Sequence, residues 1–275
     1  MKKLITLLII LSLFVPAAFA FEFQKENLGI GIEYNGLEKD VDSTKPLTID
    51  VLGITAGLKS KIDDLETNQI LGKVQYKLSE YLTPYALLGG TNLKFRQTLQ
   101  GNINSPFLSG ETNIIETRFD GGQSFTWGLG AQGKVMDLPQ GLLLSYDVRR
   151  TAFDSDDNSE SSLIPSFLDL KSNSNVEVEY AEINTSLILS KAFELDNVVK
   201  SLSPYIGYRF TNISMNLKNT YHILIADVTT EENRDTNFHS MVLGVTAKVN
   251  KNLDVSVGGS LFGERGFGVK ATYSF

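Results

Sequence analysis

The stretch Phe267-Gly-Val-Lys-Ala-Thr-Tyr-Ser-Phe275 decides the fold, because its apolar and polar residues alternate without a break. Side chains along a β-strand point alternately to its two faces. The apolar and aromatic residues of this stretch therefore share one face, and Gly268, Lys270, Thr272 and Ser274 share the other. The pattern predicts a strand over residues 267–275 with one apolar face and one polar face.

The first 20 residues have the three regions of a secretory signal peptide. Met1-Lys2-Lys3 supplies positive charge, residues 4–15 form an apolar run, and residues 16–20 include three alanines. The apolar run is shorter than the stretch of about 20 residues that a membrane-spanning helix needs, which disfavours an N-terminal anchor. We expect export and cleavage after Ala20. The sequence contains no Cys, which excludes disulfides and lipid attachment through Cys.

The sequence ends on Phe275, with Tyr273 two residues before it on the apolar face. Together with the export signal, this ending resembles the closing strand of Gram-negative outer-membrane β-barrels, whose assembly machinery reads a terminal Phe with such an aromatic partner. The resemblance implies that Tyr273 and Phe275 form an assembly signal. It also implies an outer-membrane location, with membrane lipids, lipopolysaccharide, periplasmic chaperones and the barrel-assembly machinery as partners.

Composition agrees with a barrel. Without the two lysines of residues 1–20, the chain carries 23 basic and 32 acidic residues, a formal charge of −9. This balance argues against nucleic acid as a partner, because binding to phosphates requires a concentrated basic surface. Mean hydropathy is close to neutral, and no long apolar run follows the signal peptide. Strands with a single apolar face can cross a membrane without such a run.

Ten segments with alternating polarity are found, each near the 9–11 residues that a tilted strand needs to cross a bilayer. They are residues 28–37, 70–78, 85–95, 124–135, 142–151, 176–189, 204–217, 238–249, 253–262 and 267–275. The predicted fold is all-β, a transmembrane antiparallel up-and-down β-barrel of ten strands, with eight or twelve as alternatives. We expect residues 21–275 to form a single barrel domain.

The predicted connections are of two kinds, as in outer-membrane barrels. Inner turns lie at 79–84, 136–141 and 250–252, with a longer one at 192–203. The outer connections are mostly long and polar, at 38–69, 96–123, 152–175 and 218–237; only 263–266 is tight. We expect the long ones to be extracellular loops. Residues 49–62 also have a strand pattern, which we interpret as an extension of the first hairpin above the membrane rather than a missed spanning strand.

The alternation assigns a face to each side chain. Residues such as Phe125, Trp127, Leu129 and Leu243 should face lipid. Aromatic residues near strand ends should form the two interface girdles: Tyr34, Tyr76, Tyr85, Phe210, Phe238, Phe267, Tyr273 and Phe275.

The opposite face should turn charged residues into the lumen. The predicted lumen-lining residues are Lys73, Lys77, Asp147, Arg149, Glu182, Arg209, Lys248, Asp254 and Lys270, with Glu33 as a further partner. Charges of both signs in a narrow barrel are costly unless they are paired or hydrated. Two interpretations remain: an ionic network that fills the lumen, or a narrow passage whose basic bias favours anions.

Two short motifs are considered as sites and set aside. Residues 128–133 match G-x-G-x-x-G, but a dinucleotide site needs this motif to open a helix after a strand, and here it lies within a strand pattern. His239 precedes Ser240, whereas the His and Ser of outer-membrane lipases and deacylases are separated by one position. Adjacent strand residues point to opposite faces, so this pair should not share a proton.

Two acidic segments are also weak site candidates. The outer segment with His222, Asp227, Glu231, Glu232 and Asp235 lacks the paired acidic motif of the omptin surface proteases, which are ten-stranded barrels. Residues 154–160 offer oxygen ligands at alternate positions, but the Gly and the bidentate Glu of a calcium loop are missing. We expect no catalytic, cofactor-binding or metal site, and no cofactor.

The sequence therefore favours a non-enzymatic integral outer-membrane β-barrel with a structural or surface-interaction role. A narrow porin-like channel for small anionic solutes is the first alternative, and a lipid-modifying or proteolytic barrel enzyme is the second.

Overall fold

The computed structural model describes residues 24–39, 45–51, 54–104, 109–163, 171–195, 198–223 and 226–275. The expected signal peptide, residues 1–20, lies outside the described residues. Nearly all of the described chain is in β-strands. Within these ranges no helix is long and apolar enough to span a membrane.

The described residues contain thirteen strands and two single-turn 3-10 helices. The strands are β1 Leu28–Lys39, β2 Lys45–Val51, β3 Ile54–Tyr76, β4 Thr83–Asn104, β5 Ser109–Asp120, β6 Ser124–Leu138, β7 Leu142–Leu163, β8 Lys171–Lys191, β9 Phe193–Glu194, β10 Ser201–Ile223, β11 Ala226–Lys248, β12 Leu253–Leu261 and β13 Glu264–Ser274. The helices are η1 Lys25–Asn27 and η2 Pro139–Gly141.

Ten of the described strands close into an antiparallel ring. The order around the ring is β1, β3, β4, β6, β7, β8, β10, β11, β12, β13 and back to β1. The closing ladder of β1 and β13 runs from Gly29 opposite Ser274 to Lys39 opposite Glu264. The predicted ten-stranded barrel is therefore confirmed for the described chain.

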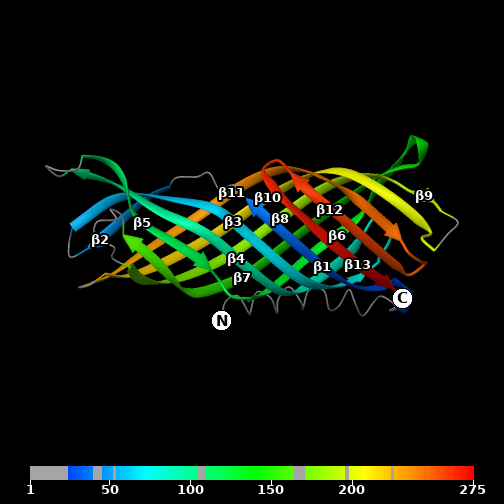
Figure 1. Cartoon of the computed structure of the whole chain (residues 1–275). Helices are drawn as coiled ribbons and strands as arrows, with labels where there is room; N and C mark the ends of the chain where they lie inside the picture. The colour runs from blue at the N-terminus through cyan, green and yellow to red at the C-terminus, as the bar shows by residue number, and fades with distance from the viewer. Residues whose placement is uncertain are drawn as a thin grey trace.

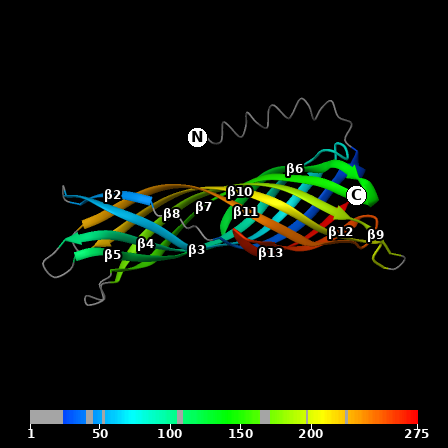
Figure 2. The ribbon, with the colours of Figure 1, turned by 90° about the horizontal axis from the view of Figure 1, so that it is seen from above.

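Two of the remaining strands lengthen the ring at one end (Figures 1 and 2). β2 pairs with the part of β3 beyond the part that pairs with β1. β5 likewise pairs with the outer part of β4 and then leads through residues 121–123 into β6. They are thus continuations of β1 and β6 and add no further spanning strand. The expectation that residues 49–62 extend the first hairpin is confirmed.

The two ends of the barrel differ in length. One end, here called the turn end, carries the short connections and the C-terminus (Figure 1). The other end, here called the extension, comprises β2, β5 and the parts of the ring that rise beyond the tight turn at 262–263 between β12 and β13. In that turn Gly263 has a φ of +45°, and a Cβ there would lie 2.7 Å from the backbone oxygen of His239.

The prediction of long outer loops was wrong for most of their length. In segments 38–69, 96–123, 152–175 and 218–237, most of the described residues belong to paired strands. β10 and β11 pair continuously from Ser201 opposite Lys248 to Ile223 opposite Ala226. Backbone groups left unpaired would otherwise need other hydrogen-bond partners, and a continuous ladder satisfies them.

Between the turn end and the extension, the barrel has an apolar outer face, as predicted. Phe125, Leu129 and Leu88 are 67%, 45% and 58% exposed on the outside. Two aromatic assignments were wrong, because Tyr85 and Phe238 point inward and are buried. The apolar outer band is typical of a barrel surrounded by lipid acyl chains.

In the extension the polarity of the two faces is reversed. On β10 the outward residues Ile206 and Tyr208 are apolar or aromatic, whereas beyond them the inward residues Ile213, Met215 and Leu217 are buried. Other strands follow the same change, and their inward side chains form one cluster, here called the plug. Its members are Ile62, Leu65, Leu93, Phe95, Phe119, Phe153, Val176, Val178, Tyr180, Ile213, Met215, Leu217 and Phe238.

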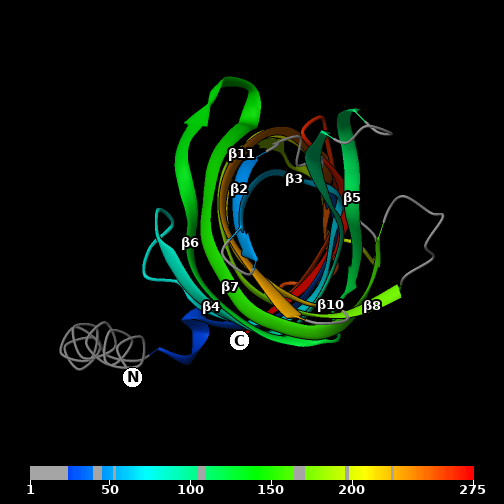
Figure 3. The ribbon, with the colours of Figure 1, turned by 90° about the vertical axis from the view of Figure 1, so that its left-hand side faces the viewer.

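The plug lies inside the ring at the level of the extension (Figure 3 looks along the barrel axis from this end). Phe95 stacks on Phe119 and Phe153 stacks on Tyr180, each with ring centroids 4.8 Å apart. Further out, Arg234 Nη2 donates to the backbone oxygen of Ser60 at 2.7 Å, which joins β11 to β3 above the short hairpin.

Truncating the plug should destabilise the barrel. Leu93 is fully buried in it, and Leu93→Ala is expected to lower the free energy of unfolding by about 2–5 kcal/mol, because it leaves a cavity. Reversible urea unfolding of the refolded barrel measures this. Val198→Ala is the control: Val198 is 83% exposed at the turn end, so its truncation should change stability by less than about 0.5 kcal/mol. Equal effects of the two substitutions would contradict the buried plug.

Candidate functional site in the barrel lumen

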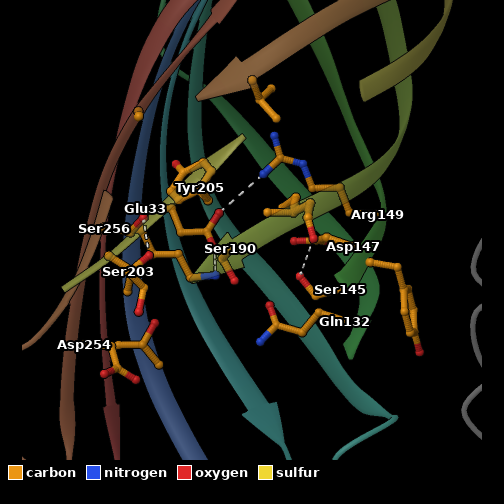
Figure 4. A pocket seen from close by; sticks show the side chains of 18 of the residues that line it. Glu33, Gln132, Ser145, Asp147, Arg149, Ser190, Ser203, Tyr205, Asp254 and Ser256 are labelled. Carbon is orange, nitrogen blue, oxygen red and sulfur yellow. Dashed lines mark hydrogen bonds and ion pairs between the residues drawn. The ribbon is translucent and has the colours of Figure 1, made fainter. Parts of the chain in front are cut away.

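The lumen on the turn-end side of the plug contains a cavity of about 670 Å³. All ten ring strands contribute side chains to it, and most of these are polar. Ser79 and Glu80, from the turn between β3 and β4, also line the cavity, so it reaches the turn end. Figure 4 shows Glu33 and Arg149 joined within it.

Three cations surround the carboxylate of Glu33. Arg149 Nη1 lies 3.4 Å from Glu33 Oε2, and the Nζ atoms of Lys270 and Lys73 lie 3.4 Å and 3.7 Å from Oε1. Lys270 stands directly opposite Glu33 in the ladder of β13 and β1. Arg149 belongs to β7, on another part of the ring. Closure of the barrel therefore brings together the sequence-predicted residues Lys73, Arg149 and Lys270.

Lys73 links Glu33 to a neighbouring set of polar groups. Its Nζ donates to Gln132 Oε1 at 2.9 Å and lies 3.7 Å from the centroid of the Tyr85 ring. The Tyr85 hydroxyl in turn donates to Asp147. A Cβ on Gly130 would lie 2.4 Å from this ring, so the glycine provides room for Tyr85. This explains part of the glycine motif at 128–133 without a nucleotide.

A second ionic group lies between the cavity and the plug. Lys39, which is fully buried, forms an ion pair with Glu182 and lies 3.5 Å from Glu264 Oε1. Its Nζ also donates to the Tyr180 hydroxyl at 2.9 Å, and this hydroxyl donates to Glu182 Oε2 at 2.6 Å. Asn184 donates to the other oxygen of Glu182. The predicted lumen residue Glu182 therefore belongs to this layer.

Arg209 differs from the other cations of the lumen. Its Nε donates to Ser186 Oγ at 3.4 Å, and it lines the cavity. No carboxylate of the described chain lies within 4.0 Å of its guanidinium. Arg209 therefore keeps hydrogen-bond donors available to the cavity.

The balance of charges at the closed end of the cavity is positive. Together with the adjoining ionic group, this end carries five positive and four negative charges, from Lys39, Lys73, Arg149, Arg209 and Lys270 and from Glu33, Asp147, Glu182 and Glu264. Such charges are tolerated away from bulk water only with partners or hydration. The excess makes this end of the cavity favourable for an anion.

Solved structures of known proteins share this fold. The chain matches the outer membrane protease OmpT from Escherichia coli with a TM-score of 0.52 and 13% identity, covering 93% of this chain and 99% of that one. The chain has an outer-membrane β-barrel fold. OprG from Pseudomonas aeruginosa (TM-score 0.40, 9% identity, 89% and 95% covered) and the β-domain of the Bordetella autotransporter BrkA (0.38, 9%, 90% and 100%) also match. Neither a family model nor a curated protein matches the sequence.

In outer-membrane β-barrels the short turns are periplasmic and the long connections extracellular. In this fold the turn end corresponds to the periplasmic end, and the cavity is a cup that opens at the turn end. The predicted residues Lys77 and Lys248 are exposed at its mouth, and Asp254 lies opposite Lys248 in the ladder. Glu80 accepts a hydrogen bond from Lys134 at 3.1 Å, which holds the pKa of the Glu80 carboxyl below its ordinary value.

Sequence reasoning missed several members of the two ionic groups. Lys39 lies two residues beyond the predicted end of the first strand, and Glu264 falls in the predicted tight turn at 263–266. Tyr85 was assigned to an interface girdle, and Tyr180 was not singled out. The signal was present, because Lys39 continues the inward series of Glu33 with period two. Extending the alternation beyond membrane length would have identified it.

His239 and Ser240 lie on opposite faces of β11, as predicted. The His239 ring is outside, in contact with the Tyr208 hydroxyl, and Ser240 Oγ donates inward to Glu264 Oε2 at 3.3 Å. The barrel therefore does not align this pair for nucleophilic chemistry.

The acidic segment of β11 does not form a cluster. Glu231 and Asp235 point outward and are exposed, whereas Glu232 is buried beside Arg234. The side chains of His222 and Asp227 lie outside the described part. No group of three or more possible metal ligands is present among the described residues.

Proposed function

We propose that the chain is a non-enzymatic integral protein of the Gram-negative outer membrane with a structural or surface-interaction role, and that its lumen does not conduct. The observation that carries this proposal is the apolar plug across the lumen of the extension. An ion that crossed the plug would exchange most of its hydration for a largely apolar surrounding, which is costly. Hydrophobic constrictions close channels for this reason.

The ionic layer below the plug also opposes passage. Lys39 is buried and paired with both Glu182 and Glu264, which are buried too, so this layer narrows the lumen below the plug. The basic bias that suggested an anion channel is present in the cup, but the cup has a closed end. We therefore favour the closed barrel over the channel.

The extension supports a role at the cell surface. β10 and β11 each have 23 residues, about twice the 9–11 residues that span a bilayer. Its outward side chains are polar and charged, as in the exposed pairs Lys94–Asp120 and Lys218–Glu177. A rigid, paired extension presents a fixed surface to partners outside the cell.

An enzymatic role has less support. OmpT is a protease, but a shared fold does not carry a shared activity. Among the acidic protease candidates whose side chains are described, Glu231 and Asp235 point outward and only Glu232 is buried, and His239 and Ser240 lie on opposite faces of the sheet.

Planar-bilayer recording tests the closed lumen. The refolded, inserted wild-type barrel should give no steady current steps. Replacing Phe95, Phe119 and Met215 of the plug together by serine should produce them, because water and ions can then enter the extension. Leu88→Ser, on the lipid-facing side, is the matched control and should remain silent. Steady, salt-dependent steps from the wild type would overturn the proposal.

A further inference from the structure

The cup has the dimensions and enclosure of a small-molecule site. Its volume of about 670 Å³ falls within the 300–1,000 Å³ typical of ligand pockets. The plug closes its outer end, and its walls are ten strands joined by ladders around the whole ring. A ligand can therefore enter only from the periplasmic mouth, and membrane lipid has no lateral route into the cup.

Polar groups without partners line the cup. Ser260 Oγ, Thr272 Oγ1 and Asn35 Nδ2 are buried and have no hydrogen-bond partner in the described chain, and all three residues line the cavity. Ser260 is 97% buried, with only 3% of its surface exposed. Buried polar groups are normally satisfied by protein or by ordered water. These three groups therefore lack the hydrogen-bond partners that buried polar groups normally have.

The charged side chains of the cup favour a negatively charged ligand. Glu33 holds three cations at once, and Asp147 accepts from Tyr85. Arg209 has only the hydroxyl of Ser186 as a described partner. Its planar guanidinium offers paired donors that match the oxygens of a carboxylate or a phosphate. An anion beside Arg209 would neutralise the unbalanced positive charge of the closed end.

We propose that the cup binds a small soluble oxyanion, a carboxylate or phosphate compound, from the periplasm, with Arg209 as its principal ligand. Polar groups elsewhere on the cup wall, such as the hydroxyls and Asn35, supply further hydrogen bonds. This inference goes beyond the proposed function, since a barrel that conducts no ions can still bind a ligand in a one-ended cup.

Equilibrium dialysis with radiolabelled inorganic phosphate tests this on the refolded barrel in a nonionic maltoside at constant ionic strength. Saturable binding of one phosphate per barrel is expected. Arg209→Gln should weaken it by about ten-fold or more, because a charge-assisted hydrogen bond is lost. Arg209→Lys should retain part of the affinity. Arg118→Gln is the matched control, since Arg118 is 74% exposed in the extension, and it should bind like the wild type.

A second variant tests the electrostatic argument in the opposite direction. Glu33→Gln removes a negative charge from the closed end, so phosphate should bind several-fold more tightly. The heat-modifiable electrophoretic band of each variant reports whether it has folded. An Arg209→Gln barrel that is folded and binds phosphate like the wild type would overturn the proposal, and so would a wild type without saturable binding.

The source of the anion is tested by adding phosphatidylglycerol. Phosphate binding in maltoside alone supports a soluble anion as the ligand. Binding at the cup that appears only when the lipid is present contradicts this proposal. Bilayer recordings on the same preparations separate this proposal from the closed lumen, because conductance and phosphate affinity can fail independently.

Discussion

Lys39→Met is expected to destabilise the barrel by about 3–5 kcal/mol, the cost of removing one partner from a buried ion pair. Lys39 is fully buried and is the cation between Glu182 and Glu264. Methionine fills a similar volume but leaves two carboxylates close together without that charge. Urea unfolding of the refolded barrel at neutral pH measures the loss.

A double substitution separates charge from packing. Adding Glu182→Gln to Lys39→Met should restore part of the lost stability, because one uncompensated charge is removed along with its partner. Lys94→Met is the matched control: its pair with Asp120 lies on the exposed surface of the extension, where an ion pair contributes about 0–1 kcal/mol. Losses that simply add in the double variant would show that the two residues do not act as a pair.

Phe275→Ser is expected to reduce folded barrel in the outer membrane strongly while leaving export intact. The resemblance to outer-membrane barrels implies that Tyr273 and Phe275 are read during assembly. In the folded barrel, Phe275 is 39% exposed and packs edge-on against Tyr273, with ring centroids 5.2 Å apart. It contributes little to the buried lumen, so its loss should act on assembly more than on stability.

Two measurements on cells and one in vitro check this expectation. The heat-modifiable band in the outer-membrane fraction should fall, whereas processed protein should still reach the periplasm, and refolding into detergent should be nearly unchanged. Phe262→Ser is the control, since Phe262 is 70% exposed at the opposite end of the same hairpin. Undiminished folded protein in the outer membrane of the Phe275→Ser strain would refute the assembly role.

The ten strands could be predicted from the sequence because alternation is a local property. Side chains at i and i+2 share a face whatever the rest of the chain does, so Phe267 and Val269 had to face outward once the last strand was recognised. The level along the barrel axis at which the apolar face changes from the outside to the inside was harder to predict. In the membrane the apolar face is outside, whereas in the extension water is outside and the apolar face turns inward.

This reversal is visible on β10 once its length is known. The apolar series occupies even positions through Phe210 and odd positions from Ile213 onward. If every strand is assumed to have membrane length, the second series falls in a polar loop, and for this reason the plug was not predicted. The assumption of membrane-length strands also led to the assignment of Phe238 to an interface girdle, although it belongs to the plug.

The sequence by itself determined the number of strands and the face of most lumen residues, because these depend on a period of two. Only the tertiary structure decided which charged residues of the lumen pair with each other. Glu33 meets Lys270 because the last strand closes on the first, and it meets Arg149 because their strands face the same lumen. Ring closure and register join residues far apart in the chain, and no local pattern encodes which charges they bring together.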